Sequence, residues 1–198
     1  MNLAKLFEMQ RQLDEHIEKE HPRKPWEDRL AKKILALQVE LGELANEWRG
    51  FKYWSNNQKP RIRAYDECPC GTDYGSCDEY GCDDGLLTYN PLLEEYVDCL
   101  HFILSIGLEL GMPHRLLLGN VQENEMLDDD FIALYDEVQA LYHAYKRKPD
   151  KKVVRIYYES VFEHFLALGK RLGFTWEQVE EAYMKKNAEN HSRQERGY

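Results

Sequence analysis

The chain has 198 residues, 43% of them hydrophobic, which favours one domain with a sizeable core. Its formal net charge of -10 argues against a general nucleic-acid binder, which needs a basic surface, but it leaves room for an anionic substrate held through cations. No apolar run reaches the roughly 18 to 20 residues of a membrane span. The segment Met1–Lys5 also lacks the apolar core of a signal peptide, so we expect a cytoplasmic protein.

Helical periodicity begins at the N-terminus, where apolar residues from Leu3 to Leu13 predict an amphipathic helix that ends at the proline-containing segment 21–25. A second helix is predicted from about Trp26 to Gly50. It carries the sequence Glu40-Leu41-Gly42-Glu43, whose two carboxylates share one helix face. This face borders the apolar stripe, so it should meet a neighbouring helix. A spacing of this kind also occurs by chance on helix surfaces that are merely solvated.

Three aromatic residues follow the second helix in the segment Phe51-Lys52-Tyr53-Trp54. They could stack on a flat base, or they could form ordinary core or interface packing. Residues 55–89 then lack a helical pattern, and they form an inserted loop or a small metal-binding module. This stretch holds four potential thiolate ligands, Cys68, Cys70, Cys77 and Cys82, within fifteen residues. In a reducing compartment such a cluster favours structural Zn²⁺, with free thiols or disulfides as the alternatives.

A third helix is predicted from Asn90-Pro91, a favourable cap and first position, to about Leu110. Its apolar residues cover nearly the whole circumference, which is typical of a buried helix. Glu95 and Asp98 share one face of it, and buried carboxylates need a counter-charge. Together with Glu40 and Glu43 they predict a Mg²⁺ site, because Mg²⁺ prefers oxygen ligands and keeps waters for substrate phosphate.

Two further helices are predicted at about 128–145 and 151–172, and a capping box at Thr175 opens a last helix that runs to about Asn190. Lys186, Asn190 and Arg193 fall on one face of it, where they suit a phosphate site or simply a charged helix end. The fold class is therefore all-α, a helical bundle of one domain over residues 1–198, with two metal-binding helices that flank the Cys-rich insert.

In this order the motifs resemble the dimeric all-α dUTP pyrophosphatases of the all-α nucleotide pyrophosphatase superfamily. The resemblance rests on five segments of the chain. They are Gln10-Arg11-Gln12-Leu13-Asp14, Glu40-Leu41-Gly42-Glu43 with the aromatic 51–54 segment, Glu95-Tyr96-Val97-Asp98 with His101-Phe102, the set Lys186, Asn190 and Arg193, and the ending Gly197-Tyr198.

The resemblance implies hydrolysis of dUTP to dUMP and pyrophosphate by a homodimer with two or more Mg²⁺ ions per site. The metal ligands would be Glu40, Glu43, Glu95 and Asp98, and Glu40 or Glu43 would handle the attacking water. Lys186, Asn190 and Arg193 would bind the phosphates. Gln10, Asp14 and Trp54 would contact uracil and sugar, and His101 and Phe102 would pack against the deoxyribose, with Phe102 as a steric gate against ribonucleotides.

One residue departs from the family pattern, because some members carry Asn at the position of Asp14. An ionised Asp accepts hydrogen bonds but donates none, so base selectivity is the open point. The alternatives are a broader (d)NTP or dCTP pyrophosphatase and a non-enzymatic helical interaction module. The module gives no reason for the buried carboxylates Glu95 and Asp98.

Overall fold

The computed structural model of the chain describes residues 2–65, 88–112, 116, 119, 124–147 and 150–197. Within these residues the regular structure consists of six α-helices and one antiparallel pair of two-residue strands, which confirms the predicted all-α class. The helices are α1 (Leu3–Glu20), α2 (Arg29–Trp48), α4 (Pro91–Glu109), α5 (Leu127–Lys146), α6 (Lys151–Arg171) and α7 (Trp176–Glu195). The strands β1 (Ala64–Tyr65) and β2 (Thr88–Tyr89) pair Ala64 with Tyr89 and Tyr65 with Thr88.

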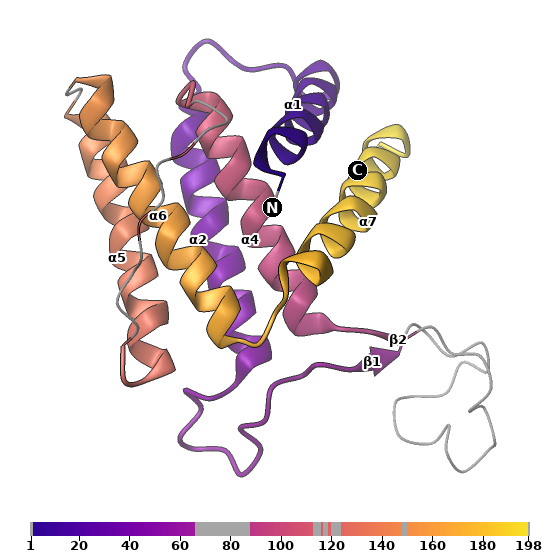
Figure 1. Cartoon of the computed structure of the whole chain (residues 1–198). Helices are drawn as coiled ribbons and strands as arrows, with labels where there is room; N and C mark the ends of the chain where they lie inside the picture. Colours follow the sequence, from indigo (N-terminus) through magenta and orange to yellow (C-terminus); the bar gives the residue numbers. More distant parts are fainter. Residues whose placement is uncertain are drawn as a thin grey trace.

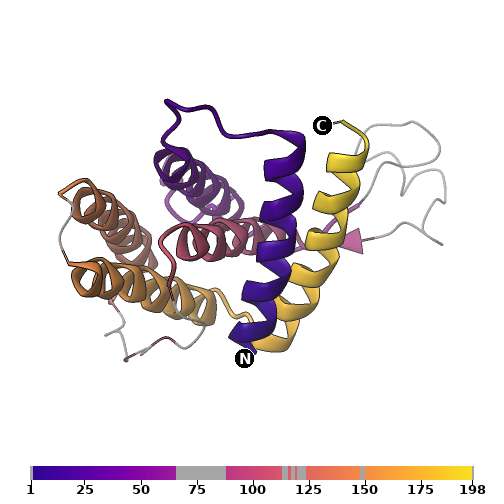
Figure 2. The same cartoon turned by 90° about the horizontal axis from the view of Figure 1, so that it is seen from above.

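Helix α4 lies at the centre of the bundle and contacts α1, α2, α6 and α7. Helices α1 and α7 lie side by side on one side of it, and α5 and α6 form a pair on the other (Figures 1 and 2). Val97, Leu100 and Leu104 of α4 are fully buried. A helix that is apolar on all sides is stable only when neighbours cover all sides, so the predicted burial of α4 is confirmed. Among the described helices, none has the length and apolar character that crossing a membrane requires.

The predicted starts of α4 and α7 are confirmed by their capping contacts. The Asn90 side chain accepts a hydrogen bond of 3.1 Å from the backbone N–H of Leu93, and Pro91 occupies the first turn. At α7, Thr175 and Gln178 form the reciprocal hydrogen bonds of a capping box. Each cap satisfies N–H groups that a helix leaves without a partner in its first turn.

Two helix limits differ from the prediction. Helix α2 begins at Arg29 rather than near Trp26, because the Asp28 side chain caps it by accepting a 2.9 Å hydrogen bond from the N–H of Ala31. Trp26 lies before the helix and is 81% exposed. Helix α7 continues past Asn190 to Glu195, which keeps all three polar residues of its predicted phosphate-binding face on one helix.

The end of α2 is tied to the start of α4 through Arg61. Its N–H donates to the Glu47 carbonyl at 2.9 Å, and its own carbonyl accepts from the N–H of Leu92 at 3.1 Å. The Arg61 guanidinium also pairs with the Glu47 carboxylate. These contacts fix the relative position of α2 and α4, the two helices that carry the acidic motifs.

Candidate active site

An acidic cluster lies where α2 and α4 face each other. Glu40 of α2 and Glu95 and Asp98 of α4 are half-buried, and each offers one carboxylate oxygen within 4.8 Å of the other two. Among the described residues this is the one group of three or more acidic, His or Cys side chains close enough to hold a metal ion. The two motifs separated by a long insert therefore converge in space.

The pKa values of all three carboxyl groups in the cluster are raised, which indicates that nearby positive charge does not balance their negative charge. Burial, followed by repulsion from Asp98 and Glu43, raises the pKa of Glu40 to about 7. Burial and the same two neighbours also raise the pKa of Glu95 to about 7. The pKa of Asp98 is raised as well, first by burial, although Lys186 opposes the shift. Carboxylates in such a setting gain from a bound divalent cation.

Glu43 is exposed and does not belong to the close trio, although it acts on the charges of Glu40 and Glu95. It lies one turn after Glu40 on the same helix face. The acidic motif of α2 thus has two different members. One carboxylate is packed against α4, and the other is open to solvent.

Lys186 of α7 faces the acidic cluster. Its Nζ lies 2.7 Å from Asp98 Oδ2 and 2.7 Å from Glu94 Oε1. Burial by itself lowers the pKa of this ammonium, but Asp98 and Glu94 outweigh it and the pKa is raised. Lys186 is therefore charged, and it is the counter-ion of Asp98 in the protein without metal.

A cavity of about 750 Å³ extends from the acidic cluster along α1, α2, α4 and α7. Glu40 and Asp98 line it beside Lys186, Asn190 and Arg193, so the predicted phosphate-binding residues share one wall. Gln10, Asp14, His101 and Phe102 also line the cavity, which brings together most of the sequence-predicted site. Arg193 Nε lies 3.3 Å from Glu189 Oε1 on its own helix.

Gln10 and His101 form a buried network with Tyr183. The Gln10 Oε1 atom lies 2.9 Å from His101 Nδ1 and accepts a 2.8 Å hydrogen bond from the Tyr183 hydroxyl. The His101 ring stacks on Tyr183 with ring centroids 4.1 Å apart. Burial lowers the pKa of His101 to about 3, so the imidazole is neutral and donates through Nδ1. The Gln10 carbonyl is thereby occupied, and its amide N–H groups face the other way.

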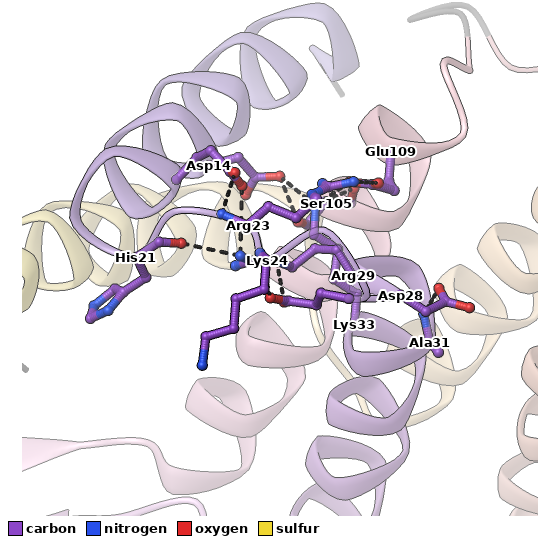
Figure 3. Close-up of polar contacts among 12 residues, drawn as sticks. Asp14, His21, Arg23, Lys24, Asp28, Arg29, Ala31, Lys33, Ser105 and Glu109 are labelled. Carbon is purple, nitrogen blue, oxygen red and sulfur yellow. Dashed lines mark hydrogen bonds and ion pairs between the residues drawn. The ribbon is translucent and has the colours of Figure 1, made fainter.

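Asp14 accepts from the residues around it. Gln10 Nε2 donates to its Oδ1 at 2.8 Å, and Ser105 Oγ and Lys33 Nζ lie 2.6 Å and 3.1 Å from its Oδ2. Figure 3 shows Asp14 and Ser105 pointing toward this shared polar group from α1 and α4. Sequence reasoning missed Lys33 and Ser105. A sequence signal for them was present: Lys33 lies seven residues before Glu40, and Ser105 lies seven residues after Asp98. Residues seven apart lie on the same face of a helix.

Of the two remaining predicted groups, one lies away from the cavity and the other falls outside the described residues. Trp54 is 65% exposed and contacts Phe51 and Tyr53 rather than the cavity wall, so its role in base binding stays a prediction. The clustered cysteines fall in the stretch 66–87, outside the described residues, and the Zn²⁺ prediction stays with them.

Carboxylates that face cations across a cavity are an arrangement expected of hydrolases that cleave phosphate linkages. A family model described as dUTPase matches residues 2–67 and 87–198. The chain therefore belongs to the all-α dUTPase family, and its activity is that of a dUTP pyrophosphatase. The matched segments leave out residues 68–86, where the clustered cysteines lie. No curated protein matches the chain significantly.

Proposed function

We propose that the chain cleaves dUTP to dUMP and pyrophosphate by water attack in this cavity, with Mg²⁺ at the acidic cluster. One observation carries the proposal: three carboxylates whose oxygens lie within 4.8 Å of one another are joined through Asp98 to the half-buried Lys186, at one end of a cavity of nucleotide size. That arrangement provides cation ligands and a phosphate partner in the same place. It is difficult to explain as surface solvation.

The donor set fits Mg²⁺ by its chemistry. All three groups of the trio offer oxygen, the ligand type that Mg²⁺ prefers, and open space in the cavity leaves room for its waters. We propose Glu40, Glu95 and Asp98 as the direct ligands. When bound, Mg²⁺ supplies positive charge that offsets the negative charge developing on the phosphate oxygens.

The attacking water needs a base that remains free when the other carboxylates bind cations. Glu43 meets this requirement, because it is exposed and outside the close trio but near enough to influence both Glu40 and Glu95. We propose that its carboxylate orients the water and accepts its proton. Glu40 then acts as a ligand that fixes the geometry.

The other residues hold the substrate. Lys186 binds phosphate as a compact charge, and Asn190 and Arg193 add hydrogen-bond donors one and two turns further along α7. His101 and Phe102 bound the middle of the cavity, where we place the deoxyribose. Phe102 fills the space that a 2′-hydroxyl would need.

We also propose a homodimer. Tyr53 and Trp54 are 86% and 65% exposed and adjacent in sequence, a costly arrangement for two large aromatic side chains in water. A second copy that covers them would bring Trp54 to an interface. Light scattering on the purified chain tests this, and a mass of one chain at micromolar concentration contradicts it.

Pyrophosphate release from dUTP, measured with Mg²⁺ and with EDTA, tests the activity and its metal dependence. Asp98→Asn removes one charge from the trio, and we expect at least about a 100-fold loss of kcat. Glu181→Gln on the exposed part of α7 is the matched control. Full activity in EDTA, or in Asp98→Asn, contradicts the proposed site.

A further inference from the structure

The end of the cavity opposite the acidic cluster is built from charged and polar side chains on three helices. Lys33 lies seven residues before Glu40 on α2, and Ser105 lies seven residues after Asp98 on α4. Seven helical residues span about 10 Å. Both helices therefore place this polar end at the same distance from the cluster, comparable with that between an α-phosphate and the far edge of a pyrimidine base in an extended nucleotide.

Lys33 is fully engaged at this position. Its Nζ lies 3.1 Å from Asp14 Oδ2, 3.2 Å from Glu109 Oε2 and 3.4 Å from the Ser105 carbonyl. An ammonium has three N–H donors, and three oxygens use them. Its side chain is 16% exposed, so solvent competes little. Lys33 has no N–H left for a ligand, and its effect must pass through the groups it holds.

The surrounding charges balance in pairs. Arg23 donates to both oxygens of Glu109 at 2.8 Å and 2.9 Å, and Figure 3 shows its guanidinium and Lys33 beside the Glu109 and Asp14 carboxylates. Two cations thus face two anions. An amide in place of Asp14 would leave one excess positive charge, and it would turn its NH₂ either toward Lys33 and Ser105 or toward the Gln10 amide.

Asp14 consequently has one position left at which it can accept a hydrogen bond. Its Oδ2 accepts from Ser105 and Lys33, whereas its Oδ1 accepts only from Gln10 among the described residues. A carboxylate oxygen can accept about two hydrogen bonds. The free position on Oδ1 accepts and never donates, so it suits an N–H of the ligand.

We infer that Lys33 is a positioning residue for base selection: it holds the Asp14 carboxylate as a fixed acceptor that takes a ring N–H and rejects a bare ring nitrogen. The inference rests on the proposed function, because it places the base at this end. Uracil offers a ring N–H between two carbonyls. Cytosine offers a bare nitrogen there, whose lone pair faces the carboxylate.

The test compares dUTP with dCTP by kcat/KM, and dUMP with dCMP by calorimetric affinity, in wild type and variants. Lys33→Met and Asp14→Asn should each reduce the preference for uracil by about 10-fold or more, the effect of one misplaced hydrogen-bond partner. Lys33→Arg keeps a cation and should retain most of the preference. Lys185→Met on α7 is the matched control, because the Lys185 side chain is exposed and is not part of the cavity lining.

The outcomes separate the two proposals. An unchanged uracil preference in folded Lys33→Met and Asp14→Asn overturns the inference, as does an equal loss in Lys185→Met. Weaker discrimination in both variants, with the preference kept in Lys33→Arg, supports it. If the wild type binds dUMP more tightly than dCMP but cleaves neither triphosphate, the proposed function fails and the base selection stands.

Discussion

Replacing Glu40 with Gln should stabilise the metal-free protein at pH 8 while it abolishes most of the activity. The pKa of Glu40 rises from 4.5 to about 7 in the folded chain, first through burial. A pKa shift of one unit corresponds to about 1.36 kcal/mol, so a shift of this size, taken in full, would lower the free energy of unfolding at pH 8 by roughly 3 kcal/mol. Solvent screens a half-exposed carboxylate, and Asp98 and Glu43 share the repulsion, so we expect about 1 to 2 kcal/mol. For a chain of this size that raises Tm by about 2 to 8 °C.

The gain should depend on pH in a defined direction. Because its folded pKa is raised, Glu40 binds a proton more tightly in the folded than in the unfolded state. The contribution of the Glu40 carboxyl to folding stability is therefore fully present below about pH 4.5, and it is lost as the pH rises through about 7. At pH 5 the wild-type carboxyl is already largely protonated when folded, so Glu40→Gln should gain little there.

Differential scanning calorimetry in EDTA at pH 5 and pH 8 measures this. Glu181→Gln removes an exposed carboxylate of α7 and should change Tm little at either pH. Added Mg²⁺ should raise the Tm of the wild type more than that of Glu40→Gln, because ligands that bind only the folded state stabilise it. A lower Tm for Glu40→Gln at pH 8, or an equal gain at both pH values, would refute the reasoning.

Three further predictions address other parts of the molecule. Phe102→Ala should increase hydrolysis of UTP relative to dUTP in a pyrophosphate assay, because the side chain fills the cavity where we place the sugar; an unchanged ratio contradicts the gate. Gly169→Ala should cost about 1 to 3 kcal/mol in urea unfolding, since a Cβ there overlaps the Tyr96 hydroxyl, and a neutral effect contradicts close α4–α6 packing. The His16 and His191 rings stack, with their Nδ1 atoms 2.9 Å apart, which leaves room for one hydrogen between the two nitrogens. Burial and His16 lower the pKa of His191 below 6.5, so its stabilisation is present above that pH and lost as pH falls; His191→Gln should flatten the loss of Tm between pH 7 and pH 5, and an unchanged slope contradicts the pairing.

The helices and their order could be predicted because each has its own local signals. Apolar periodicity marked α1, α2 and α4, and caps at Asn90 and Thr175 marked the starts of α4 and α7. The start of α2 was harder to place. Trp26 fits an apolar pattern, but the Asp28 side chain supplies the cap, and that contact decides where the helix begins.

The acidic cluster could also be predicted, because a divalent cation is the simple remedy for carboxylates on a buried helix. The division of roles within it could not. Whether Glu40 or Glu43 packs against α4 depends on the rotation of α2 about its axis, which the tertiary contacts set. Lys33 and Ser105 stayed hidden for the same reason: each is unremarkable on its own helix, and their meaning comes from alignment across α1, α2 and α4.

The ion pairs of Lys186 imply that, on the proposed function, the metal-free and the substrate-bound states would differ. Its Nζ bridges Asp98 and Glu94 at 2.7 Å each, so it occupies a carboxylate that the proposed function assigns to a cation. A cation held by Asp98 would repel the ammonium and release it into the cavity, where we propose that the substrate phosphates bind. Glu94 stands outside the acidic trio and can keep one contact during that move. On the proposed function, metal binding and phosphate binding would thereby be coupled through this one side chain, because a cation on Asp98 would free the Lys186 ammonium for the substrate.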